Sequence, residues 1–178
     1  MSTDRPRIPG LGQSPDEGVS ATITDALAGI ALVDHHVHGP LRTAITRDEF
    51  EVLITESNEP APAATVHSDS QVGFAIRALC APLLGIPAHA PMDDYWDGRS
   101  RHTPNELTRI LMGATHTGHW LLETGYKGDA ILDPTALTAQ GVGRVSEVVR
   151  LESVLESVAK GANASDLASR FTSELASR

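Results

Sequence analysis

The stretch ALVDHHVHGP, residues 31–40, decides the fold because it is an apolar run that ends in three histidines and an aspartate. A short segment that is apolar on both sides is typical of a strand inside a parallel sheet. Alternate side chains of a strand share a face, so we expect Asp34, His36 and His38 to point the same way. Two imidazoles on one face can bind one metal ion, and an ordinary polar strand end is the alternative.

Helix and strand signals alternate along the rest of the chain. Thr46 and Thr103 are predicted helix caps, the latter with Pro104 at the first helical position and Glu106 at the capping-box position. A further apolar helix is predicted around Cys80. The stretches HWLLETG and SEVVRLESV read as a second and a third strand. Strands separated by helices predict a parallel sheet, here with a long helical insertion after the first strand.

The composition excludes several classes of partner. The chain has 14 Lys and Arg against 23 Asp and Glu, a net charge of -9, so nucleic acid and anionic membranes are repelled. Neither a membrane-spanning run nor a signal peptide is apparent, which predicts no membrane association. The single cysteine fits a reducing compartment, and we predict a cytoplasmic protein with a small-molecule substrate.

The first strand resembles a known family. An apolar strand that runs into Asp-x-His-x-His and then Gly-Pro is similar to the first barrel strand of the amidohydrolase superfamily, which carries two metal ligands there. The stretches APLLGIPAHAP, LLETGYKGD and EVVRLESV resemble successive segments of the amidohydrolase-2 group, especially the branch found alone or ahead of a glutamine-synthetase-like domain. The resemblance covers about residues 23–178, and only the N-terminal part of the family's domain.

The resemblance implies an α/β fold, a partial (β/α)8 TIM barrel made of roughly the first three strands. An eight-stranded barrel takes about 250 residues, and this chain ends on a predicted helix where a fourth strand would follow. We therefore expect residues 1–18, rich in Pro and Gly, to form a flexible leader and residues 19–178 to be the N-terminal portion of a barrel domain. An open half-barrel exposes apolar strand edges, which predicts self-association.

The function that the resemblance implies is that of a metal-dependent hydrolase. His36 and His38 would bind a divalent ion, zinc in the first place, with manganese or iron as alternatives. The ion would activate a water molecule against an amide, ester or lactone. The other ligands and the proton-transferring aspartate of the family have no counterpart here, so no catalytic residue is assigned. A metal-dependent decarboxylase and an inert fragment or interaction module are the alternatives.

Further polar residues follow the predicted strands. Asp34 is expected to support the site from behind by orienting a ligand or a neighbouring loop. Glu123 ends the second strand, where a structural role competes with contact to substrate or to a histidine. Arg150 and Glu152 flank Leu151, and an ion pair between them competes with recognition of a substrate carboxylate.

Two pairs of residues in loops are less decisive. Tyr126 and Lys127 lie between glycines after the second strand, where a ligand contact competes with a solvated loop. In the insertion, Tyr95 and Trp96 could form an apolar wall of the site or simply pack the insertion against the barrel.

Overall fold

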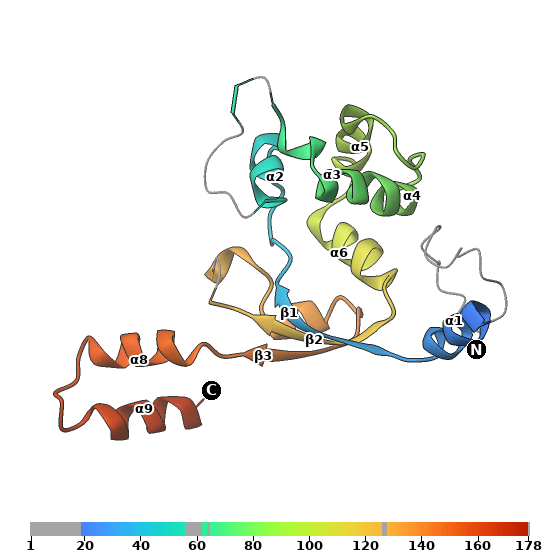
Figure 1. The fold of residues 1–178 in the computed structure, drawn as a ribbon. Helices are drawn as coiled ribbons and strands as arrows, with labels where there is room; N and C mark the ends of the chain where they lie inside the picture. The colour runs from blue at the N-terminus through green and yellow to red at the C-terminus, as the bar shows by residue number, and fades with distance from the viewer. Residues whose placement is uncertain (1–18, 56–61, 64, 126–127, 178) are drawn as a thin grey trace.

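The computed structural model describes residues 19–55, 62–63, 65–125 and 128–177 (Figure 1). The elements follow one another as α1 (Val19–Ala28), β1 (Leu32–His38), α2 (Arg47–Leu53), the 3-10 turn η1 (His67–Asp69), α3 (Gln71–Ala75), the π-helical η2 (Ile76–Cys80), α4 (Ala81–Leu83), α5 (Met92–Arg99), α6 (Pro104–Gly113), β2 (Thr117–Glu123), the 3-10 turn η3 (Gly128–Ala130), α7 (Pro134–Thr138), β3 (Arg144–Val148), α8 (Leu151–Ala159) and α9 (Leu167–Ala176).

The three strands form one parallel sheet in the order β1-β2-β3. His38 lies opposite Glu123 at the end of β1, and Glu123 lies opposite Val148 at the end of β2. The pairing of β1 with β2 is irregular between Asp34 and Val37. The carboxyl ends of the strands therefore meet at one edge of the sheet, which is the edge where ligands bind in open parallel sheets.

The prediction of a partial (β/α)8 barrel is wrong, although the small parallel α/β sheet and its strand order agree with the sequence. The sheet is open, and no strand in the described ranges pairs with the outer side of β1 or of β3. Three short strands cannot close on themselves, since a barrel needs about eight. The third strand also ends earlier than expected, because α8 begins at Leu151 and a strand was predicted through this residue.

The insertion between β1 and β2 is helical, as predicted. Thr46 and Thr103 both cap their helices through complete capping boxes, with Glu49 and Glu106 as the reciprocal partners. The helices α2 to α5 form a layer above the sheet in Figure 1, and α6 leads back to β2. This layer has a core of its own, made of Phe50, Ala81, Met92 and Tyr95.

A second core packs against the sheet itself. It contains two residues of β2 together with residues of α7 and of the segments beside it: Trp120, Leu122, Leu132, Leu137 and Val142. The indole nitrogen of Trp120 donates to the carbonyl of Val142 at 3.0 Å, so the buried ring leaves no unpaired polar atom. This packing holds the sheet in place against α7.

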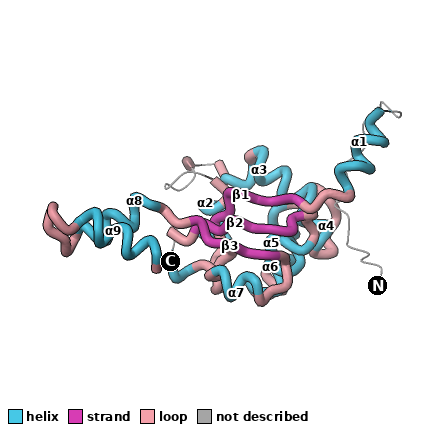
Figure 2. The backbone as a smooth tube through the Cα atoms, turned by 90° about the horizontal axis from the view of Figure 1, so that it is seen from below, coloured by secondary structure: helices cyan, strands magenta, loops and turns pink. Residues whose placement is uncertain are grey.

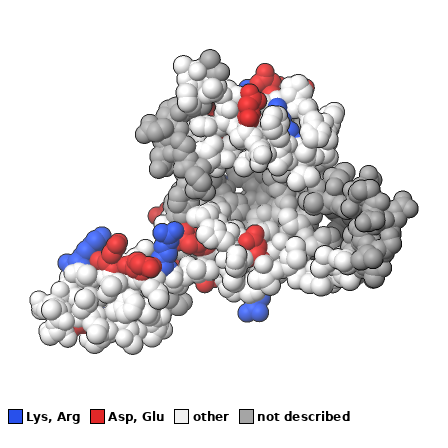
Figure 3. Space-filling model, in the orientation of Figure 1, with Lys and Arg blue, Asp and Glu red and all other residues white. Residues whose placement is uncertain are grey.

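Two helical segments project from opposite ends of the sheet. Figures 1 and 2 place α1 beside the amino end of β1 and the α8–α9 pair beyond the carboxyl end of β3. On the face seen in Figure 3, charged side chains gather along one side of the α8–α9 pair and leave the rest uncharged. Among the described residues, no helix is long and apolar enough to cross a bilayer.

Candidate functional site

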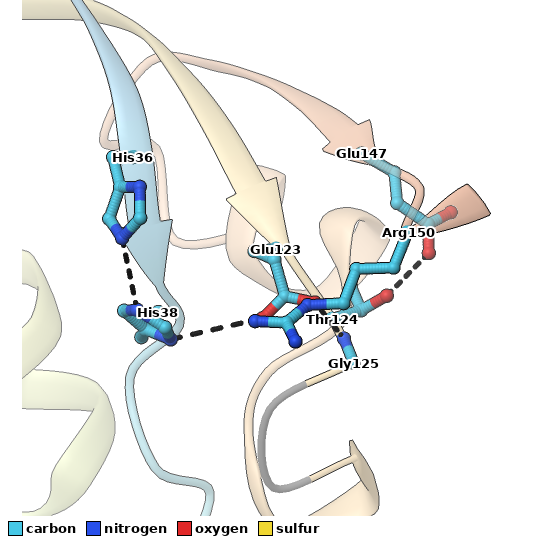
Figure 4. A network of polar contacts seen from close by, with 7 residues as sticks. All are labelled: His36, His38, Glu123, Thr124, Gly125, Glu147 and Arg150. Atoms are coloured by element: carbon cyan, nitrogen blue, oxygen red, sulfur yellow. Dashed lines mark hydrogen bonds and ion pairs between the residues drawn. The ribbon is translucent and has the colours of Figure 1, made fainter. Parts of the chain in front are cut away.

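His36 and His38 meet at the carboxyl edge of the sheet, as their alternation along β1 predicts. Their Nε2 atoms are 3.2 Å apart, and the rings lie edge to face with centroids 5.1 Å apart (Figure 4). The side chain of His38 is 42% exposed, so the pair faces solvent. The local irregularity of β1 does not separate the two side chains.

The spacing of the two nitrogens fits a shared divalent ion. Imidazole nitrogens bind zinc at about 2.0–2.1 Å, and two ligands at 90–109° around one ion are roughly 2.9–3.4 Å apart. The observed 3.2 Å falls within this interval. The described part of the chain contains no group of three or more His, Cys, Asp or Glu side chains around one point, so the two histidines would leave the other positions to water or substrate.

Glu123 connects β1 with the segment after β3. Its Oε1 accepts the backbone N–H of Gly125 at 2.6 Å and the Nε of Arg150 at 3.0 Å. Its Oε2 lies 3.8 Å from Nδ1 of His38, on the side of that ring away from His36 (Figure 4). Glu123 is only 8% exposed, so its carboxylate is fixed and partly shielded from water. Glu123 thus holds the segments after β2 and β3 through Gly125 and Arg150, and it also faces a histidine.

Gly125 is required at its position by the same network. A Cβ at this residue would lie 2.5 Å from Oε1 of Glu123 and 3.3 Å from Cδ of Arg150. The absent side chain lets the turn after β2 approach the carboxylate closely enough for the N–H bond. Next to it, the hydroxyl of Thr124 donates to Glu147 of β3 at 2.5 Å.

The remaining predicted residues lie only partly where they were expected. Arg150 pairs with Glu123 and not with Glu152. The chain becomes helical at Leu151, so Glu152 lies in the first turn of α8 and not on a strand face beside Arg150. Asp34 accepts the backbone N–H of His36 at 3.1 Å, so it orients the strand end that carries the histidines. Tyr126 and Lys127 lie outside the described residues.

The aromatic pair of the insertion is divided between two roles. Tyr95 is 1% exposed and belongs to the core of the helical layer, and its burial raises the pKa of its phenol. Trp96 lines a cavity of about 380 Å³ between this layer and α6, a cavity that the sequence did not predict. The one signal for it is the spacing of Leu107 and Leu111, which lie one turn apart on α6 and both face the cavity.

Comparison with known proteins gives one weak likeness. The chain is 29% identical over 82 residues to the 5'-methylthioadenosine/S-adenosylhomocysteine nucleosidases of Bacillus thuringiensis (strain Al Hakam), Bacillus cereus (strain AH187) and Bacillus anthracis (strain CDC 684 / NRRL 3495). The match covers 46% of this chain and 36% of each relative, so the chain spans about a third of the relatives that it matches. No family model and no solved structure matches.

The predicted function is corrected by this comparison. The matched proteins are named as nucleosidases, which agrees with the prediction of an enzyme and contradicts that of a metal-dependent amidohydrolase. The predicted TIM barrel is also wrong, because the sheet is open. The described residues contain no cluster of three metal ligands, so they provide no complete ligand set for a metal-dependent hydrolase. The comparison gives no support to a decarboxylase either. The physical reason for the error is that a His-x-His strand end specifies at most a pair of ligands and no reaction.

Proposed function

We propose that the carboxyl edge of the sheet is a hydrolytic site for a small molecule, and that its substrates are nucleosides. The observation that carries the proposal is the continuous chain of contacts from Arg150 through Glu123 and His38 to His36. The class of substrate rests on the likeness to nucleosidases. A single cysteine suits a reducing compartment, so we place the reaction in the cytoplasm.

The chain of contacts can move protons. The Glu123 carboxylate faces Nδ1 of His38, where it orients the ring, and the other nitrogen of His38 faces His36. In hydrolysis of an N-glycosidic bond, the oxygen of water bonds to the sugar carbon while the bond from this carbon to the base breaks. The proton that the water loses passes to the imidazole pair, which returns one to the leaving base.

The test is release of a free base from nucleosides. We expect adenine from 5'-methylthioadenosine or adenosine, measured by chromatography. Glu123→Gln removes the carboxylate charge that faces Nδ1 of His38, and it should lower the rate by about 10²-fold or more. Glu152→Gln is the matched control, because Glu152 lies in the first turn of α8, outside the chain of contacts. No adenine from any nucleoside, or equal rates in both variants with an unchanged melting temperature, would reject the proposal.

The separation of the two Nε2 atoms favours a second candidate function, the binding of a divalent cation by His36 and His38. Zinc is our first choice, with manganese and iron as alternatives. We also propose kinship with the amidohydrolase superfamily, which a metal site at His36 and His38 would support. In this arrangement Glu123 would hold the outer nitrogen of His38 and orient the ligand.

Titration calorimetry with zinc on the chelator-treated protein separates the two candidates. We expect one ion per chain, and a loss of affinity of at least tenfold in His36→Ala. His35→Ala is the control, since His35 neighbours the pair along β1 without belonging to it. Equal zinc affinity in both variants would rule out the ligand assignment. If the chelator-treated protein still releases adenine, the ion takes no part in the reaction.

A further inference from the structure

The cavity beside Trp96 is separate from the carboxyl edge of the sheet. Its walls come from the segment after β1 (residues 40–45), from α2, from the end of α5 and from α6, and none of the residues of the His36–Glu123 site lines it. Its volume of about 380 Å³ is within the range of pockets for small organic ligands, about 300–1,000 Å³. The cavity can therefore hold a ligand that does not touch the site described above.

One wall of the cavity is aromatic and preformed. The rings of Phe50 and Trp96 are 5.6 Å apart between centroids, with a tilt of 43°. Phe50 is 7% exposed and belongs to the core of the helical layer, so this wall is held in place without a ligand. Leu107, Leu111 and Met112 of α6 also line the cavity. This space suits a flat or branched apolar group.

A cation lies at the rim of this apolar space. The guanidinium of Arg99 is 5.0 Å from the centre of the Phe50 ring, which fixes it at the aromatic wall. The arginines that form ion pairs between described residues are Arg42, Arg47, Arg150 and Arg170, whereas Arg99 donates a hydrogen bond to the phenol of Tyr95. Ser100 and His102, further along the same turn, also line the cavity and supply hydrogen-bond donors. Arg99 therefore brings to this aromatic wall a positive charge that has no carboxylate partner among the described residues.

We propose that this cavity binds a small aromatic carboxylate. The ring of the ligand packs against the Phe50–Trp96 wall and the leucines of α6, and its carboxylate pairs with Arg99. Phosphate alone fills too little of the space, and a neutral hydrocarbon forms no ion pair with the guanidinium. This inference does not depend on the proposed hydrolytic function and stands or falls separately from it.

The chain contains its own reporter for the test. It has two tryptophans, and each gives one indole N–H signal in an NMR spectrum of the nitrogen-15-labelled protein. Trp96 lines the cavity, whereas Trp120 is buried in the core against the sheet with its N–H bonded to Val142. Titration with 4-phenylbutyrate should shift the Trp96 signal to saturation and leave the Trp120 signal in place. The neutral 4-phenylbutyramide should bind at least tenfold more weakly.

Variants at two neighbouring arginines test the role of the charge. Arg99→Gln should weaken 4-phenylbutyrate at least tenfold, while Arg99→Lys, which keeps the cation, should retain the preference for the acid over the amide. Arg101→Gln is the matched control, because Arg101 is exposed and does not line the cavity. The unchanged Trp120 signal verifies that each variant is folded. An unshifted Trp96 signal, equal binding of acid and amide, or equal weakening by Arg99→Gln and Arg101→Gln would overturn the proposal.

Discussion

Glu123 serves different partners through its two carboxylate oxygens, and this division of roles organises the candidate site. One oxygen is held by Arg150 and by the N–H of Gly125, which leaves the other directed at His38. The sequence predicted that His36 and His38 share a face, because alternation along a strand is a local rule. It did not predict the Glu123–Arg150 pair, whose members are 27 residues apart and meet only because β2 and β3 are neighbours.

Glu106 gives a prediction at the residue scale. Its pKa is lowered from the usual 4.5, first by the backbone N–H of Thr103 and then by the hydroxyl of Thr103. A lowered pKa in the folded state adds stability that is present above pH 4.5 and is lost as the pH falls through the folded value. The wild-type protein should therefore have a higher melting temperature than Glu106→Gln at pH 7, and this difference in melting temperature should become smaller below pH 4.5.

Thermal unfolding at several pH values measures this difference. The control is the Glu106→Gln change made in a Thr103→Ala background. The hydroxyl donor is then absent, so the change should lower the melting temperature less at neutral pH. A difference that does not change between pH 7 and the acid range would show that the carboxylate charge contributes nothing to the cap.

At the scale of elements, the sequence was most reliable where the signal lies within one turn. The two capping boxes form as predicted, since each needs only residues three positions apart. The helix expected around Cys80 forms as the consecutive segments α3, η2 and α4, and burial raises the pKa of the Cys80 thiol. The third strand was predicted too long, because the apolar run through Leu151 suits a strand and an amphipathic helix equally.

Gly73 tests how tightly α3 packs against the turn before it. A Cβ at Gly73 would lie 2.0 Å from the backbone oxygen of Ser68, which is itself buried and bonded through its N–H to Glu51. Since the backbone of Ser68 cannot move away cheaply, Gly73→Ala should lower the free energy of unfolding by about 1–3 kcal/mol.

Urea denaturation compares this variant with Gly113→Ala in α6. No atom lies within 4 Å of a Cβ at Gly113, so this alanine should be neutral or stabilising by up to about 1 kcal/mol. If Gly73→Ala is no less stable than Gly113→Ala, the prediction that α3 packs closely against the backbone of Ser68 is wrong.

At the scale of the whole molecule, apolar surface is left uncovered at the outer side of β1. Ile23 and Leu27 of α1 are 54% and 59% exposed, and Leu32 and Val33 of β1 are 53% and 60% exposed. The outer hydrogen-bonding edges of β1 and β3 are unpaired by any strand in the described ranges. Exposed apolar residues beside an unpaired strand edge favour association with another chain.

Self-association is therefore expected for this chain. Sedimentation velocity should give a weight-average mass above 18.9 kDa that increases with protein concentration. Leu32→Lys combined with Leu27→Ser should shift the distribution toward the monomer, because both changes remove apolar surface at the edge of β1. The control is Leu155→Ser in α8, at the other end of the sheet. A mass of 18.9 kDa at every concentration would contradict the expectation.

The sequence by itself determined the features that depend on near neighbours: the apolar strand that ends in paired histidines, the helix caps, and the order of strands and helices. These follow from side-chain alternation, capping and chain length, which act over a few residues. Only the tertiary structure decided that the sheet stays open, that Glu123 joins His38 to Arg150, and that a cavity forms between the helical layer and α6. Each of these depends on which distant segments pack together, and no local pattern encodes that choice.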